Sequence, residues 1–172
     1  MLFRSVVGPR EPPEIAPRWV VINYDILGKH LDWLERDWAG LVCDEAHFLK
    51  NYRSQRHSHV RKIVNAMGEE RPLHLLTGTP LTNRPRDLFP LLQLVRHTLG
   101  RNFLAFAKRY CDAHHNGYGW VTDGASNLEE LRDQLHGIML RRNKEEVLDL
   151  PPKIRTWLPV RVPEGKIGRA HV

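Results

Sequence analysis

The sequence is poor in cysteine and has no long apolar run, and each absence excludes a class of protein. Only Cys43 and Cys111 occur among the 172 residues, too few for the disulfide framework of a small secreted domain or for a four-cysteine zinc site. No apolar stretch approaches the ~20 residues that a membrane-spanning helix needs. The residues after Met1 also lack the long apolar core of a signal peptide. We therefore predict a soluble protein of a reducing intracellular compartment, without a membrane partner.

The charge balance is modestly basic. The chain has 26 Lys and Arg against 20 Asp and Glu, a formal net charge of +6. Such an excess suits a polyanionic partner, but it is also common on proteins that bind nothing acidic. Charge alone therefore leaves nucleic-acid binding open.

The order of apolar patterns predicts an α/β fold. Short apolar runs at residues 19–23, 40–43 and 73–76 have the length of strands buried on both faces. Helical periodicity occurs between them, at residues 25–36 and 60–67. This alternation predicts a parallel sheet covered by helices, and we assign it to a domain over residues 18–85.

The regions on either side of this domain have different compositions. Four prolines among charged residues favour a loop-like segment over residues 1–17. Beyond Pro80, apolar stripes with helical spacing predict helices near residues 88–99 and 103–110 and from about Asn127, with a glycine-rich polar stretch before the last. We therefore expect a helical extension over residues 86–160.

Two adjacent acids follow one of the predicted strands. The run from Leu41 to Cys43 leads directly into Asp44 and Glu45, where a parallel sheet presents its carboxyl edge to a ligand crevice. In phosphoryl-transfer chemistry one such acid holds Mg²⁺ through water and its neighbour orients the attacking water. For an isolated acid pair, two exposed loop carboxylates are the favoured interpretation.

A second predicted strand also ends in polar residues. Leu75 and Leu76 are followed by Thr77, Gly78 and Thr79, which would lie at the same edge of the sheet as the acids. Two strand ends with this chemistry seldom occur together by chance, so the pair favours a nucleotide crevice.

Several ordered motifs resemble a known family. Asp-Glu-Ala-His at residues 44–47 and Thr-Gly-Thr-Pro at 77–80 resemble the second and third motifs of superfamily-two helicases. The Swi/Snf branch is the finer match, through Val-Val-Ile-Asn-Tyr-Asp at 20–25, Phe-Leu-Lys-Asn at 48–51, Leu-Thr-Gly-Thr-Pro-Leu-Thr-Asn at 76–83 and the segment 139–153. Residues 109–112, 117–120 and 126–131 resemble its annealing-helicase (HARP-like) subgroup and the bacterial relatives of that subgroup. The resemblance covers about residues 18–160.

The resemblance implies a fold, a function and a set of site residues. The fold would be a partial RecA-like lobe, a P-loop NTPase fold lacking its first strand and P-loop, and the function ATP-dependent translocation on double-stranded or branched DNA. Asp44 and Glu45 would be catalytic, with Asp44 holding Mg²⁺ through water. The residues implied to couple nucleotide to DNA are His47, Thr77, Gly78 and Thr79, and those implied as DNA or interlobe contacts are Lys50, Asn83, Arg141, Arg142 and Lys144.

The sequence lacks the loop that would hold the phosphates of ATP. A P-loop needs a glycine-rich turn followed by Lys and then Ser or Thr, whereas Gly28-Lys29 precedes His30 and Gly165-Lys166 precedes Ile167. In the resembled family this loop lies upstream and a second lobe lies downstream. We therefore expect a fragment of a parent that uses ATP and Mg²⁺, itself inactive and binding neither tightly.

Further expectations concern the end of the chain, its oligomeric state and its cellular location. Residues 161–172 read as a tail, and from Ile167 onward they look like a translated sequencing adapter. We expect a monomer in the cytoplasm of a bacterial or viral system, or in the nucleus if the source is eukaryotic.

Two other functions compete with the translocase. The first is a non-catalytic basic module that binds DNA or a protein without nucleotide. The second is a metal site built on Cys111, His114 and His115, with His57 and His59 as further candidates. No spacing among these residues matches a recognised zinc pattern.

Overall fold

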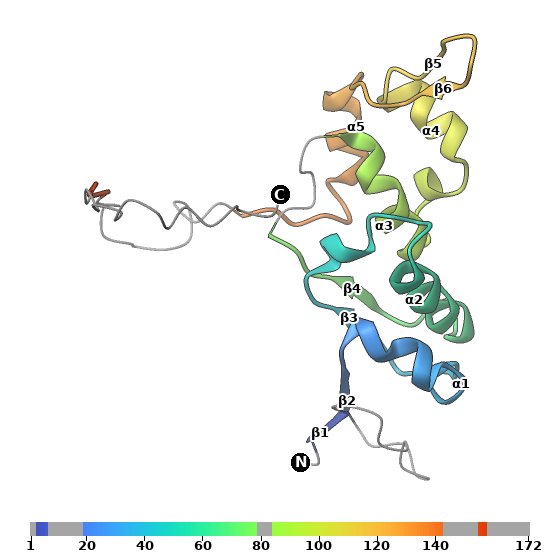
Figure 1. Cartoon of the computed structure of the whole chain (residues 1–172), viewed down its shortest axis with the longest axis vertical. Helices are drawn as coiled ribbons and strands as arrows, with labels where there is room; N and C mark the ends of the chain where they lie inside the picture. Colours follow the sequence, from blue (N-terminus) through green and yellow to red (C-terminus); the bar gives the residue numbers. More distant parts are fainter. Residues whose placement is uncertain (1–2, 7–18, 79–83, 143–154, 158–172) are drawn as a thin grey trace, which may run out of the picture. The chain divides into compact units, whose positions relative to one another are not determined.

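The computed structural model describes residues 3–6, 19–78, 84–142 and 155–157. The chain divides into two compact units, Met1–Gln134 and Leu135–Val172. Figure 1 shows the order of the elements along the chain.

The three predicted strands are present. They are β2 (Trp19–Ile22), β3 (Leu41–Cys43) and β4 (Leu73–Leu75). Strands β3 and β4 pair in parallel, with Leu41 opposite Leu73 and Cys43 opposite Leu75. Helix α2 (Gln55–Ala66) connects them, so the predicted parallel α/β arrangement is confirmed for this pair.

Two expectations about the strands are wrong. A strand, β1 (Phe3–Val6), lies inside the segment 1–17 expected to be a loop, and it pairs in parallel with β2. Composition missed it because the prolines of this segment begin only at Pro9. The strands are also not buried on both faces, since Val21 is 50% and Val42 55% exposed. Each sheet has two strands in the described part of the chain, and side chains on one face lack cover.

Helical segments cover the other face of β3 and β4. Residues predicted as one helix form a 3₁₀ segment, η1 (Tyr24–His30), followed by α1 (Leu31–Leu34). A short 3₁₀ helix, η2 (Ala46–Leu49), follows β3, and Ser54 caps α2 by accepting a hydrogen bond from the His57 N–H at 3.2 Å. The buried core between these elements consists of Leu27, Leu34, Cys43, Ala46, Leu49, Val60, Ile63, Val64, Met67, Leu91 and Leu94.

The predicted helical extension is present as far as Leu135. Its elements are η3 (Pro85–Leu88), α3 (Phe89–Leu94), η4 (Thr98–Gly100), α4 (Phe103–Tyr110) and α5 (Leu128–Leu135). The glycine-rich stretch contains an antiparallel hairpin of β5 (His114–His115) and β6 (Trp120–Val121). Rings of Phe89, Phe106 and Tyr110 pack in series, with centroids 5.5 Å and 5.2 Å apart, which joins α3 to α4.

Arg96 closes the end of α2. Its guanidinium donates to the backbone oxygens of Val64, Met67, Gly68 and Glu69. The last carbonyls of a helix have no partner inside the helix, and a cation there also complements the helix dipole. Arg96 adopts a left-handed backbone conformation, φ 57°, which an arginine tolerates here because these bonds hold it.

We expect Arg96→Met to lower the free energy of unfolding by about 1–3 kcal/mol, because two half-buried and two exposed carbonyls lose a charged donor while the aliphatic stem is kept. Urea denaturation followed by circular dichroism measures the change. Arg101→Met, at an exposed arginine five residues along, is the matched control. Equal effects of the two substitutions would show that Arg96 does not stabilise the end of α2.

Candidate functional site

The acid pair lies directly after β3, as the sequence predicts. The Asp44 carboxylate accepts a hydrogen bond from the Glu45 N–H at 2.9 Å, which fixes its orientation. Glu45 has a left-handed backbone, φ 47° and ψ 45°, so the chain turns sharply as it leaves the strand. Such strain in a residue other than glycine is typical of functional sites. Both acidic residues are exposed to solvent.

The segment after β4 lies against the acid pair. The Leu76 N–H donates to the Cys43 carbonyl at 2.9 Å, and the Ala46 N–H donates to the Leu76 carbonyl at 2.8 Å. The parallel pairing thus continues past both strands, which puts Thr77 and Gly78 at the same sheet edge as Asp44. Thr77 is half-buried and Gly78 exposed. Thr79 and Asn83 fall outside the described residues.

Tyr24 supports the acid pair from the end of β2. Its hydroxyl donates to the Asp44 carbonyl at 2.7 Å. Burial raises the pKa of Tyr24 well above its ordinary value, and the neighbouring Cys43, Asp44 and Glu45 raise it further. Burial also raises the pKa of Cys43 to about 11. Both groups therefore stay protonated near neutral pH, and Tyr24 remains a donor. The sequence placed Tyr24 inside a motif but gave it no role.

We expect Tyr24→Phe to lower the free energy of unfolding by about 1 kcal/mol, since it removes one hydrogen bond and leaves the Asp44 carbonyl without this donor. Chemical denaturation of the chain tests this. Tyr118→Phe is the control because Tyr118 is fully exposed. A Tyr24→Phe protein as stable as that control would mean that the hydroxyl does not fix the strand end.

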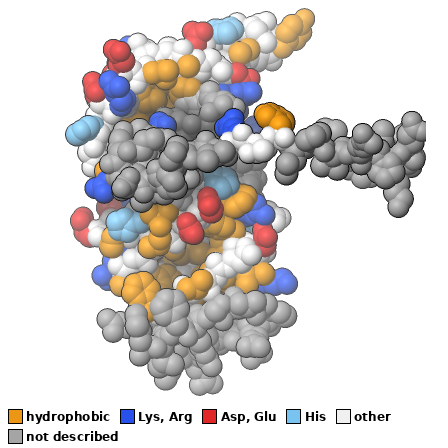
Figure 2. Space-filling view, turned by 90° about the vertical axis from the view of Figure 1, so that its left-hand side faces the viewer, with side chains coloured by type: hydrophobic (Ala, Val, Ile, Leu, Met, Phe, Trp, Pro, Cys, Tyr) orange, Lys and Arg blue, Asp and Glu red, His pale blue; other side chains and the backbone are white. Residues whose placement is uncertain are grey.

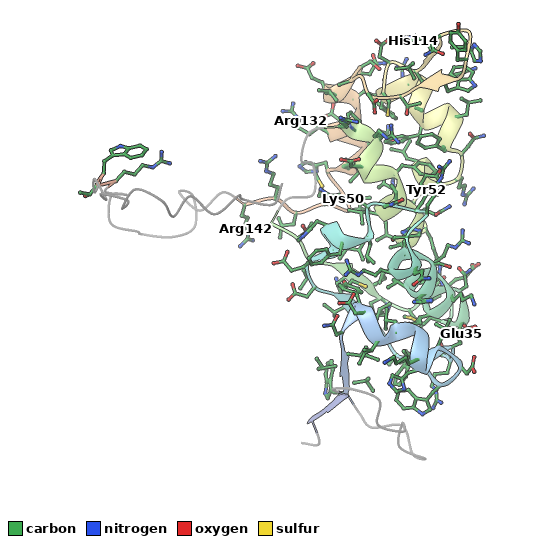
Figure 3. The ribbon with its side chains drawn as sticks, viewed as in Figure 1. Glu35, Lys50, Tyr52, His114, Arg132 and Arg142 are labelled. Carbon is green, nitrogen blue, oxygen red and sulfur yellow. The ribbon has the colours of Figure 1, made fainter. Side chains whose placement is uncertain are left out.

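His47 lies on η2, the short helix that follows the acid pair, and Lys50 lies at the end of this helix. His47 Nδ1 is 3.0 Å from Glu45 Oε2, an ion-pair distance when the ring is protonated, although it does not meet hydrogen-bond geometry. The His47 and Phe48 rings are 4.2 Å apart. Ala46 and Leu49 are completely buried, and they anchor η2 so that His47 stays beside Glu45. Lys50, labelled in Figure 3, is half-buried at the end of η2.

These residues fit the metal-holding half of a nucleotide site. Carboxylate oxygens suit Mg²⁺, which keeps several waters and binds through one or two carboxylates and the substrate phosphates. Within the described residues, no group of three or more His, Cys, Asp and Glu side chains is arranged to hold a metal. Because Mg²⁺ keeps several of its waters, a metal at Asp44 would be held largely through water and phosphate oxygens. The chain has no glycine-rich turn followed by Lys and Ser or Thr.

An open cavity of about 350 Å³ lies next to the site. Its lining includes Tyr24, Asp25, Phe48, Arg56 and His59. Arg56 forms an ion pair with Asp25 at 2.6 Å and lies over the Phe48 ring at 5.3 Å. None of the predicted site residues that the structure describes lines this cavity, and Tyr24 is the link between the cavity and Asp44.

The remaining predicted contacts belong to the second unit or lie outside the described residues. Arg141 and Arg142 are exposed, and Figure 3 labels Arg142. Lys144 is outside the described residues. The structure therefore brings together Asp44, Glu45, His47, Thr77 and Gly78 but does not test the basic contacts.

The fold and the site define a mixed α/β domain whose parallel strand pair presents acids and a hydroxyl at one edge. The model of the SNF2-related domain family matches residues 16–166, and the chain belongs to this family. The resemblance seen in the sequence is thereby confirmed.

Annealing helicases are among the similar proteins. The chain is 36% identical over 146 residues to the SWI/SNF-related matrix-associated actin-dependent regulator of chromatin subfamily A-like protein 1 of Xenopus laevis, covering 84% of this chain and 15% of that protein. It is 41% identical over 131 residues to the DNA annealing helicase and endonuclease ZRANB3 of Homo sapiens, covering 73% of this chain and 12% of that protein. The chain thus spans less than a fifth of the length of these relatives.

No helix in the described part of the chain combines the length and the apolar character that crossing a membrane requires.

Proposed function

We propose that this chain is part of a RecA-like first lobe of an ATP-dependent DNA translocase. The observation that carries the proposal is the paired edge of β3 and β4, where two backbone hydrogen bonds hold the segments of Asp44 and Thr77 side by side. Membership of the SNF2-related family supports it. An acid pair and a hydroxyl at one edge of a parallel sheet suit phosphoryl transfer.

Each residue of this edge has a proposed role. Asp44 holds Mg²⁺ through water, and Glu45 orients the water that attacks the γ-phosphate of ATP. When bound, Mg²⁺ would neutralise part of the negative charge on the phosphates. His47 beside Glu45, together with Thr77, Gly78 and Thr79, transmits the state of the nucleotide to the DNA-binding surface.

The proposed partner is double-stranded or branched DNA. Two observations support this choice: the mouse and human ZRANB3 relatives are DNA annealing helicases by name, and the chain has a net charge of +6. Proposed contacts to DNA or to a second lobe are Lys50, Asn83, Arg141, Arg142 and Lys144. We place the protein in the bacterial or viral cytoplasm, or in the nucleus of a eukaryotic source, as a monomer.

The 172 residues alone should not turn over ATP. Without a Lys-bearing glycine-rich loop, much of the transferring phosphate charge stays uncompensated. ATP and Mg²⁺ should therefore bind weakly.

The test compares ATP turnover, with and without duplex or forked DNA, in two proteins. One is this chain, and the other is a chimera in which the aligned part of this chain, 73% of its length, replaces its counterpart in human ZRANB3. We expect no turnover from the chain and DNA-stimulated turnover from the chimera. If the chimera folds but does not turn over ATP, while unaltered ZRANB3 does, the result would favour the alternative function of a non-catalytic binding module. Turnover by the chain alone would contradict our account of the phosphate site.

A further inference from the structure

The β5–β6 hairpin presents an aromatic side chain at its tip. The Asn116 side-chain oxygen accepts hydrogen bonds from the N–H groups of Tyr118 at 3.0 Å and Gly119 at 2.9 Å. The Asn116 N–H donates to the Gly119 carbonyl at 3.1 Å. These bonds fix the turn through Asn116 and the backbone, so the Tyr118 side chain is not needed to form it. Figure 1 shows the hairpin beside α4.

The Tyr118 ring is open to solvent. Its exposed fraction is 101%. Gly117 has φ +94°, and a side-chain carbon added at Gly117 or Gly119 would meet nothing within 4 Å. Glycine on both sides therefore leaves both faces of the ring uncovered by neighbouring side chains. An amphipathic ring held this way is available for stacking.

A second ring and a cation lie behind the tip. Trp120 is 47% exposed, and Lys108 of α4 has its ammonium 5.0 Å from the centre of the indole ring. His115 packs edge-on against the same indole, with centroids 5.9 Å apart. Leu104, 40% exposed, lies one helical turn before Lys108 on α4. Figure 2 shows exposed hydrophobic side chains beside histidine at the upper end of the view, the height of the hairpin in Figure 1.

The charge around these rings favours an anionic partner. The acidic Asp123, after β6, is already held by Arg84 at 2.7 Å and Arg86 at 2.6 Å. Asp112, before β5, is exposed and offsets part of the positive charge. Lys108, which lies over the indole, nevertheless brings a positive charge directly to this surface.

We propose that the β5–β6 hairpin binds unpaired bases of DNA. Tyr118 stacks on an exposed base, Trp120 offers a second stacking surface, and Lys108 binds a neighbouring phosphate. Sites for single-stranded nucleic acid combine aromatic rings with cations. Each base offers a face on which a ring can stack, and each phosphate linkage has a negative charge that a cation can bind. In duplex DNA the bases are already stacked on one another, so the hairpin distinguishes forked from blunt DNA. This inference rests on the proposed function, in which DNA is the partner.

The test measures binding of the 172-residue chain to two fluorescent DNAs by anisotropy at low salt. One is a fork with single-stranded arms, and the other is a blunt duplex of equal length. Tyr118→Ala should weaken binding to the fork about 5- to 100-fold, the range that the loss of one stacked base gives, and change blunt-duplex binding less than about twofold. Tyr118→Trp should restore fork binding. Replacing the arm bases by abasic sites should remove the difference between wild type and Tyr118→Ala.

The outcomes separate this inference from the proposed function. Fork binding unchanged by Tyr118→Ala, with duplex binding intact, overturns the hairpin's role and leaves the translocase proposal standing. An equal loss on both DNAs overturns base stacking as the mechanism. If the wild-type chain binds neither DNA at any concentration tested, DNA as the partner and the hairpin's role both fail. Unchanged thermal unfolding of Tyr118→Ala excludes misfolding as the cause of any loss.

Discussion

Glu45→Gln in the ZRANB3 chimera should lower DNA-stimulated ATP turnover by about 10²–10⁴-fold, the contribution typical of a positioned general base. The amide keeps the size of the side chain, but one acceptor oxygen becomes an NH₂ donor, so the side chain can neither align the attacking water in the same way nor accept its proton. Because Asp44 is unchanged, binding of ATP with Mg²⁺ should change little. Turnover assays under saturating DNA, together with equilibrium binding of a fluorescent ATP analogue, measure the two effects separately.

The matched control is Glu35→Gln. Glu35 is an exposed acid at the end of α1, labelled in Figure 3, and it takes no part in the proposed site. Its substitution should leave turnover within about twofold of the unsubstituted chimera, the scale of a surface change away from any special feature. Comparable turnover by the Glu45→Gln and Glu35→Gln chimeras would rule Glu45 out as the residue that orients the water.

Leu49→Ala should lower the free energy of unfolding by about 3–5 kcal/mol, as truncation of a fully buried leucine does when the cavity cannot collapse. Leu49 is 0% exposed and belongs to the core that joins η2 to α2. Its carbonyl also lies 2.9 Å from the ring Nδ1 of His57, a residue that is 1% exposed. Loss of the Leu49 side chain would therefore loosen η2, the helix that contains His47, as well as the core.

Urea denaturation of the 172-residue chain measures this change. Leu104→Ala is the control, because Leu104 is a leucine on α4 that is 40% exposed, and its truncation should cost less than about 1 kcal/mol. If the two alanine variants unfolded at the same urea concentration with the same slope, Leu49 would not be part of a tightly packed core.

The strand positions and the acid pair could be predicted because they depend on local patterns. Apolar runs at 40–43 and 73–76 end in polar residues, and parallel strands place such ends at a common edge. The structure pairs β3 with β4 in the register that this requires.

Other features could not be predicted because they depend on residues distant in sequence. Strand β1 exists through its pairing with β2, and Tyr24 reaches Asp44 across 20 positions. Arg96 contacts carbonyls about 30 residues away. Neither composition nor periodicity carries information about such partners.

The sequence alone determined the family, the positions of β2, β3 and β4, and the residues at the ends of β3 and β4, since each of these depends on neighbouring residues along the chain. Tertiary structure alone decided which groups fix Asp44, which side chain closes α2, and that Tyr118 projects without cover between two glycines. The physical reason is that hydrogen bonds and burial depend on distances in space, which pairing and packing set only after the chain folds.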